Sequence, residues 1–133
     1  MKKKLLLLIS GVACLAVAAP VLANGHTDSN WGDTVPWGKD NHYTAPQWKY
    51  ETTPGYITLS SGSQAGAVNA WMQLHNGVEV NSPKTKVNRG SYAKVHGDAH
   101  ELYGNVRVRM AIENNAWRPY SETAYGVWSP DSY

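Results

Sequence analysis

Two histidines and an aspartate lie within five residues of one another in the stretch KVHGDAH, which spans residues 94–100. On an extended chain His96, Asp98 and His100 would project from one face, and imidazole and carboxylate groups are common ligands of zinc and copper. Gly97-Asp98 is itself a turn-type dipeptide, however, and a turn would break the alternation on which such a site depends. A metal site also needs further ligands and supporting groups, and the other histidines are scattered along the chain. We therefore favour a polar strand that runs into a turn and keep the metal site as the alternative.

Arginine side chains alternate along the segment NVRVRMAIEN. Together with Lys94, Arg107 and Arg109 could form a basic stripe for a wall polymer or a phosphate group, because guanidinium groups bind such anions with paired hydrogen bonds. The competing interpretation is cross-strand ion pairing, which antiparallel neighbours favour. The acidic candidates for such pairs are Glu79, Glu101 and Glu113. We favour ion pairing here.

Three tryptophans lie in a polar segment that is rich in glycine, proline, asparagine and aspartate: Trp31, Trp37 and Trp48. Exposed aromatic side chains beside glycine are typical of sugar-stacking surfaces, membrane-interface contacts and docking peptides. The same side chains could instead fold back and cap the core, and the sequence leaves both interpretations open. We expect the remaining tryptophans to serve packing: Trp71, Trp117 and Trp128.

The sequence offers little support for catalysis. In GSQAG, residues 62–66, the serine stands one place too early for a nucleophile elbow. Acidic side chains could act as a pair across a sugar, but the spacing between strands cannot be read from a sequence. The carboxylates considered are Glu51, Glu79, Glu101 and Glu113. We predict no catalytic residue and no cofactor, and a metal-dependent or carboxylate-based hydrolase is the alternative.

The N-terminal segment has the features of a secretory signal. Lys2, Lys3 and Lys4 precede an apolar run, and Val21 and Ala23 have the spacing that signal peptidase requires. We therefore expect residues 1–23 to be removed, which leaves a mature chain with no transmembrane segment.

Removal of this segment changes the composition of the chain. Three of the 12 basic residues leave, so the formal charge of the mature chain is 9 − 10 = −1, which gives no case for a nucleic-acid partner. The one cysteine, Cys14, leaves as well, so the mature chain cannot use disulfides or thiol catalysis. The mature domain must be held together by its core.

The clearest element is a strand over residues 105–114. Within it Val106, Val108, Met110 and Ile112 alternate with polar residues and share one face, as in a half-buried strand. Other β-prone runs lie at 56–61, 67–75, 91–96 and 122–128. An Asn76-Gly77 pair between the runs at 67–75 and 78–80 predicts a hairpin with a type I′ turn.

These runs are separated by turn residues, and no convincing helix interrupts them. The pattern predicts an all-β domain: a small antiparallel β-sandwich, or a partly open barrel, of five to seven strands after an irregular N-terminal arm. The arm is expected because residues 24–54 show no period of 2 or 3.6. The chain is thus expected to comprise a signal peptide at 1–23, the arm at 24–54 and the β domain at 55–133.

The segments NAWMQL, VNRGSYAKV, NVRVRMAIENN and AYGVWSPDS, together with the signal peptide, carry a resemblance to a known family. Between about Tyr50 and Ser132 the chain resembles a family of short secreted proteins of unknown function, found mainly in Gram-positive bacteria. That family has no assigned activity. The resemblance implies a secreted, single-domain, all-β product and assigns no site residue.

We expect a secreted, non-enzymatic β domain that binds an extracellular or cell-surface target. The partner would be a cell-wall or surface component or another extracellular protein, and bacteriocin-like action on neighbouring cells is the sharpest form of this hypothesis. A structural component of an extracellular matrix is a further alternative to the hydrolase. The expected binding residues are Trp31, Trp37, Trp48, Arg107 and Arg109.

Overall fold

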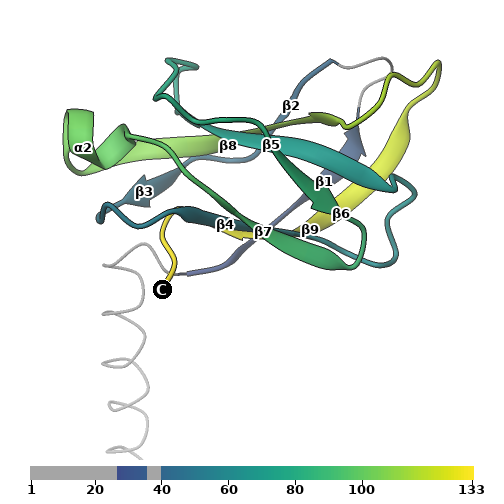
Figure 1. Cartoon of the computed structure of the whole chain (residues 1–133), viewed down its shortest axis with the longest axis horizontal. Coiled ribbons are helices and arrows are strands. Elements are labelled where there is room, and N and C mark those ends of the chain that lie inside the picture. The colour runs from purple at the N-terminus through teal and green to yellow at the C-terminus, as the bar shows by residue number, and fades with distance from the viewer. Residues whose placement is uncertain (1–26, 36–39) are drawn as a thin grey trace, which may run out of the picture.

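The computed structural model describes residues 27–35 and 40–133, which form two antiparallel β-sheets packed face to face (Figure 1). The four-stranded sheet has the order β1 (Ser29–Val35), β9 (Glu122–Ser129), β4 (Gly55–Leu59) and β7 (Ser91–Val95). The five-stranded sheet has the order β2 (His42–Tyr43), β8 (Val106–Asn114), β5 (Ala67–Leu74) and β6 (Thr85–Asn88), and β3 (Gln47–Lys49) pairs with β8 beside β2. The expected signal peptide and Trp37 lie outside the described residues. The predicted sandwich is confirmed, and the two sheets are not closed into a barrel.

The space between the sheets is filled by the row of residues that defined the clearest strand. Val108, Met110 and Ile112 of β8 are fully buried, and Val106 is partly buried against the same cluster. Each fully buried side chain of this size contributes about 1.5–3 kcal/mol. A slip of one residue in register would expose the whole row, so its burial fixes how β8 pairs with β5.

Part of the expected irregular arm is ordered in the sheets. Strand β1 pairs with β9 from Ser29 to Val35, and β2 and β3 line one edge of β8. The expectation of irregular structure is therefore wrong at 29–35, 42–43 and 47–49. These segments lack a hydrophobic period because edge strands gain their order from backbone pairing with a neighbour.

Trp31 shows how β1 is attached to the sandwich. Its side chain is 5% exposed and belongs to the core cluster, and its indole Nε1 donates a hydrogen bond to the Thr58 carbonyl oxygen over 3.0 Å. Its Cα partner on β9 is Gly126, where an added Cβ would overlap that same oxygen. The glycine leaves the room in which the tryptophan crosses to β4.

The predicted turn after β5 is present, but its type differs. The amide of Leu74 donates to the Val78 carbonyl oxygen over 2.9 Å, which closes a loop of three residues. Gly77 has a φ of 91°, whereas Asn76 is not among the residues with positive φ, so the turn is not type I′. The returning chain forms one isolated bridge, between Gln73 and Glu79, in place of a strand.

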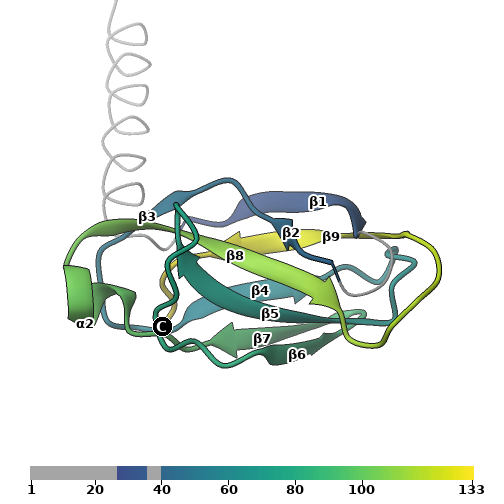
Figure 2. The same cartoon turned by 90° about the horizontal axis from the view of Figure 1, so that it is seen from above.

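A short helix, α2 (Ala99–Tyr103), connects β7 to β8 at one end of the sandwich, which the sequence did not predict (Figures 1 and 2). It begins after Asp98 and packs the fully buried Ala99 into the core cluster. No helix among the described residues is long and apolar enough to cross a membrane.

Candidate functional site

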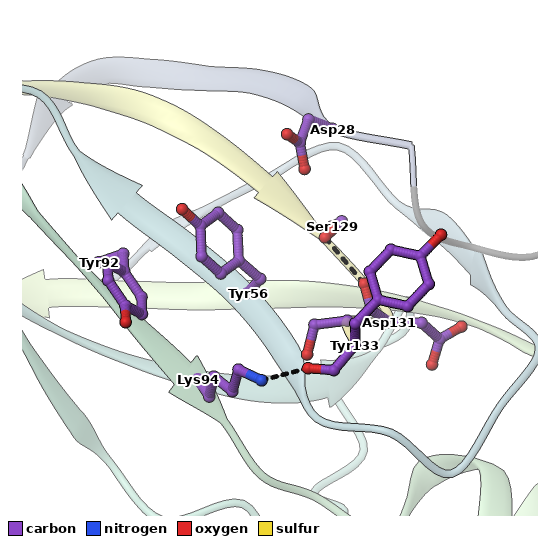
Figure 3. Close-up of a pocket in the computed structure, with 8 residues that line it drawn as sticks. Asp28, Tyr56, Tyr92, Lys94, Ser129, Asp131 and Tyr133 are labelled. Atoms are coloured by element: carbon purple, nitrogen blue, oxygen red, sulfur yellow. Dashed lines mark hydrogen bonds between the residues drawn. The ribbon is translucent and has the colours of Figure 1, made fainter. Parts of the chain in front are cut away.

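A hollow of about 400 Å³ lies on the outer face of the four-stranded sheet (Figure 3). Tyr56 reaches it from β4, and Tyr92 and Lys94 reach it from β7. Its other walls come from segments at the two ends of the described chain: Asp28, Ser129, Asp131, Ser132 and Tyr133. The hollow thus joins residues that lie far apart in the sequence.

A second hollow of about 320 Å³ shares Tyr56 and Tyr92 with the first. It continues along the sheet over a wall of small polar residues, namely Thr58, Ser60, Ser61 and Ser91, with Leu59 and Gly90. We call the two hollows together the tyrosine groove. Because the two hollows adjoin at Tyr56 and Tyr92, the groove suits an extended ligand that contacts both.

Strand alternation places the tyrosines in this groove. On β4 the buried Ile57 and Leu59 face the core, so Tyr56 and Thr58 face outward. On β7 the fully buried Val95 sets the same alternation, which turns Tyr92 and Lys94 to the outside.

The two tyrosine rings lie close together in the groove. Tyr56 is the Cα partner of Lys94, and Thr58 is the Cα partner of Tyr92, so the tyrosines are diagonal neighbours across the strand pair. Their ring centroids are 5.5 Å apart and the rings are tilted by 31°. Tyr92 is 61% exposed, which leaves its ring open to a ligand. Together the rings offer an apolar platform with two hydroxyl groups.

The C-terminal segment forms one wall of the groove, and a buried ion pair holds it in place. The Lys49 Nζ lies 2.5 Å from Asp131 Oδ1, and both side chains are 0% exposed. The ammonium also donates to the carbonyl oxygens of Thr53 and Pro130. The carboxylate also accepts from the Tyr50 amide over 3.0 Å and from the Thr53 hydroxyl over 3.1 Å. We call this ion pair the Lys49–Asp131 latch.

The latch has a chemical consequence for the groove. Asp131 contributes to the lining, but three donors occupy its carboxylate, so it is not a free acid or base for catalysis. Lys94 is committed as well, since it donates to the Tyr133 carbonyl oxygen (Figure 3). The rigid wall and the open tyrosine rings make the groove suitable for binding.

The residues of the KVHGDAH stretch are not brought together as a metal site. Strand β7 ends at Val95, and Asp98 instead accepts a hydrogen bond from Asn81 over 3.1 Å. His100 lies in α2, where its Nε2 is 3.2 Å from the Asn105 side-chain oxygen. Within 27–35 and 40–133 no group of three or more His, Cys, Asp or Glu side chains could hold a metal ion.

The tryptophans expected to bind a ligand differ in their surroundings. Trp31 is buried in the core, which corresponds to the alternative that such residues fold back onto the sandwich. Trp48 is 49% exposed on β3 and stacks on Tyr50, with centroids 6.3 Å apart. Only Trp48 of this pair is therefore open to a partner.

The tryptophans expected to serve packing are divided in the same way. Trp71 and Trp128 are buried, as predicted. Trp117 is 60% exposed in the connection between β8 and β9, so the packing prediction is wrong for this residue.

The structure does not bring together the three residues of the basic stripe that the sequence suggested. Arg107 is exposed and Arg109 half-buried on the outer face of β8, whereas Lys94 belongs to the other sheet and lines the tyrosine groove. The favoured ion pairing is not what holds Arg109, because its guanidinium donates twice to the Gln73 side-chain oxygen. Glu113 pairs with Lys84 instead, over 3.0 Å.

The sequence reasoning did not identify the tyrosine groove. Tyr56 begins the run YITLSS and Tyr92 lies in SYAKVH, and each has an outward position in an alternating pattern. That signal was available for each strand separately. The pairing of β4 with β7, which makes the two tyrosines neighbours, is a property of the tertiary structure.

Comparison with known proteins gives a family but no activity. Residues 19–132 match the family described as "Protein of unknown function (DUF2712)". No curated protein and no solved structure gave a match. The function must therefore be argued from the site itself.

Proposed function

We propose that this chain, which belongs to the DUF2712 family of proteins of unknown function, is an extracellular binding domain that holds a glycan of a cell surface along its tyrosine groove. The observation that carries this proposal is the pair of adjoining hollows that share Tyr56 and Tyr92. Concave sites that combine an apolar platform with a few polar groups are where proteins most often bind ligands.

The chemistry of the groove favours a ligand that is rich in hydroxyl groups. A sugar ring presents C–H groups on its face, which pack on an aromatic ring, and hydroxyl groups at its edge, which hydrogen-bond to polar side chains. The groove supplies the rings of Tyr56 and Tyr92, and the serine and threonine hydroxyls of its second hollow lie beside them. A linear glycan would contact both hollows at once.

The pairing of Asp131, a carboxylate that lines the groove, favours binding without catalysis. Two aspartates line the groove, Asp28 and Asp131, and Asp131 is neutralised by Lys49. A glycoside hydrolase needs two free carboxyl groups on either side of the scissile bond. The latch gives Asp131 a structural role instead.

The test is a binding measurement with the mature chain, residues 24–133, and two probes: purified peptidoglycan, and soluble neutral polysaccharide prepared from bacterial cell walls. We expect Tyr92→Ala to weaken binding about tenfold, which corresponds to about 1.4 kcal/mol. Tyr103→Ala is the matched control, because Tyr103 is 51% exposed and lies in α2, away from the groove. Equal binding by the two variants, or no binding of either probe by the unchanged chain, would contradict the proposal.

The proposal also includes export and cleavage after Ala23. Mass spectrometry of the protein recovered from the culture medium should then show a chain that begins at Asn24. Retention of the intact precursor in the cell would contradict it.

Bacteriocin-like action is the sharpest form of the same function, since a protein that binds wall glycan can disturb the growth of a neighbouring cell. Purified mature protein should then slow the growth of related strains, and Tyr92→Ala should abolish the effect. If the protein binds glycan and slows no strain in a broad panel, this form is wrong and the binding function stands.

A further inference from the structure

Positive side chains gather on the outer face of the five-stranded sheet, which is the side of the sandwich opposite the tyrosine groove. Arg107 and Arg109 of β8 lie on this face, and so do Lys86 of β6 and Lys84 just before it. Two acidic side chains accompany them, Glu79 and Glu113. Among the described residues, the face thus carries four positive side chains against two negative ones, and Lys84 is the one of the four that pairs with a carboxylate, that of Glu113.

Aromatic rings alternate with these cations across the strands. The Lys84 ammonium lies 4.6 Å from the centroid of the Trp71 ring, and the Arg109 guanidinium lies 3.8 Å from that of Tyr43. Trp71 and Tyr43 are both Cα partners of Ala111, whose small side chain lies between the two rings.

The alternation continues at the next edge of the sheet. Arg107 is the Cα partner of Trp48, which is 49% exposed. We call the set Lys84, Tyr43, Arg109, Trp48 and Arg107 the basic–aromatic stripe. Trp71 is 6% exposed and supports Lys84 from beneath.

Two of the cations in the stripe are held in fixed positions. Arg109 donates from Nε and Nη2 to the Gln73 side-chain oxygen, and the Gln73 amide in turn donates to Glu79 over 2.6 Å. Lys84 is held between the Trp71 ring and Glu113. Side chains that are already ordered lose less conformational entropy when a ligand binds.

We propose that the basic–aromatic stripe is a second binding site, for a linear polymer that carries phosphate groups along its chain. Charge complementarity selects a polyanion, and guanidinium groups bind phosphate oxygens with paired hydrogen bonds. Arg107 and Arg109 are two residues apart on a strand, so their side chains leave the sheet about 7 Å apart. This spacing lets two phosphates of one extended chain contact the two arginines.

The stripe and the groove differ in position and in ligand chemistry, so this site does not depend on the proposed glycan binding. The groove offers tyrosine rings and hydroxyl groups on the four-stranded sheet, whereas the stripe offers fixed cations on the five-stranded sheet. One molecule could therefore hold two different polymers on its opposite faces.

The experiment titrates the mature chain with long-chain inorganic polyphosphate at several salt concentrations and follows its tryptophan fluorescence, to which the exposed Trp48 contributes. We expect Arg107→Gln to weaken binding several-fold and to lower the slope of log affinity against log salt by about one. Arg107 is exposed on its strand, so this variant should fold. Arg118→Gln is the matched control: it removes the same charge from the connection between β8 and β9, where Arg118 is 48% exposed.

The outcomes separate the alternatives. Selective weakening by Arg107→Gln, with Tyr92→Ala unchanged, supports the stripe. Equal weakening by Arg107→Gln and Arg118→Gln would show that binding follows net charge alone, and loss of binding in Tyr92→Ala would assign the polymer to the groove. Binding to vesicles of anionic phospholipid without binding to polyphosphate would also overturn the proposal, because it would identify a membrane surface as the partner.

Discussion

Replacing Asp131 by asparagine should destabilise the sandwich strongly, because it leaves the Lys49 ammonium buried without its counter-ion. Both side chains are 0% exposed, so water cannot replace the lost carboxylate. Removing one partner of a buried ion pair typically costs about 3–5 kcal/mol. The asparagine amide keeps one acceptor oxygen, and its NH2 group meets a donor at the position of the other carboxylate oxygen, which now accepts from Lys49 and Thr53 or from Tyr50. The expected loss is therefore about 3–5 kcal/mol.

Such a loss is large for a domain of this size, whose free energy of unfolding should be about 5–15 kcal/mol. Urea unfolding followed by tryptophan fluorescence measures it directly, because a loss of stability lowers the midpoint while the slope stays the same. Arg118→Met is the control variant, because Arg118 also pairs with a carboxylate, Glu122, but lies at the surface, where the two side chains are 48% and 15% exposed. Breaking that surface pair should cost about 0–1 kcal/mol.

A double variant separates charge from packing. Replacing both partners, as Lys49→Met with Asp131→Leu, removes both buried charges and should recover much of the loss, because apolar pairs of similar volume often match a buried ion pair in stability. If Asp131→Asn costs no more than Arg118→Met, the ion pair does not hold the C-terminal segment, and the reasoning about the latch is wrong. Our account of the rigid groove wall would then be wrong as well.

Three further substitutions test the fold. Gly126→Ala should cost about 1–3 kcal/mol or more in urea unfolding, because its Cβ would overlap the Thr58 carbonyl oxygen; unchanged stability would refute the close approach of β9 to β4. Trp31→Phe should cost about 1 kcal/mol through the lost indole hydrogen bond to Thr58, in addition to lost packing, and a neutral result would place Trp31 outside the core. Gly77→Ala should cost about 1 kcal/mol because φ is 91° there, and a gain in stability would contradict that turn.

The sequence alone determined the elements whose signal is local. The alternation of Val106, Val108, Met110 and Ile112 predicted β8 and its buried face, because a period of two has one physical solution on a half-buried strand. The Asn76-Gly77 pair placed a turn after β5 for a similar reason, since glycine permits the positive φ that the turn requires. The type of this turn could not be predicted, because the loop length depends on how the chain pairs after the turn. It pairs there through one bridge, between Gln73 and Glu79.

The candidate sites depended on neighbours that the sequence does not name. Lys49 looks like a solvated residue of a polar segment, and its burial follows from the position of Asp131 at the far end of the chain. The sequence allowed Trp31 either to bind a ligand or to pack on the core. The structure decides for packing, because Gly126 leaves room for the indole ring and the Thr58 carbonyl oxygen accepts its hydrogen bond.

The two binding surfaces show the same division. The alternation of buried and exposed residues along each strand predicts that Tyr56, Tyr92 and Arg107 point outward, because that alternation is a property of each strand by itself. Strand order then decided that the two tyrosines share a groove, and that Arg107 lies beside Trp48 while Lys94 faces the opposite side. Strand order follows from which edges pair and which faces bury the most apolar surface, and those energies arise between segments distant in the chain, so only the tertiary structure could determine it.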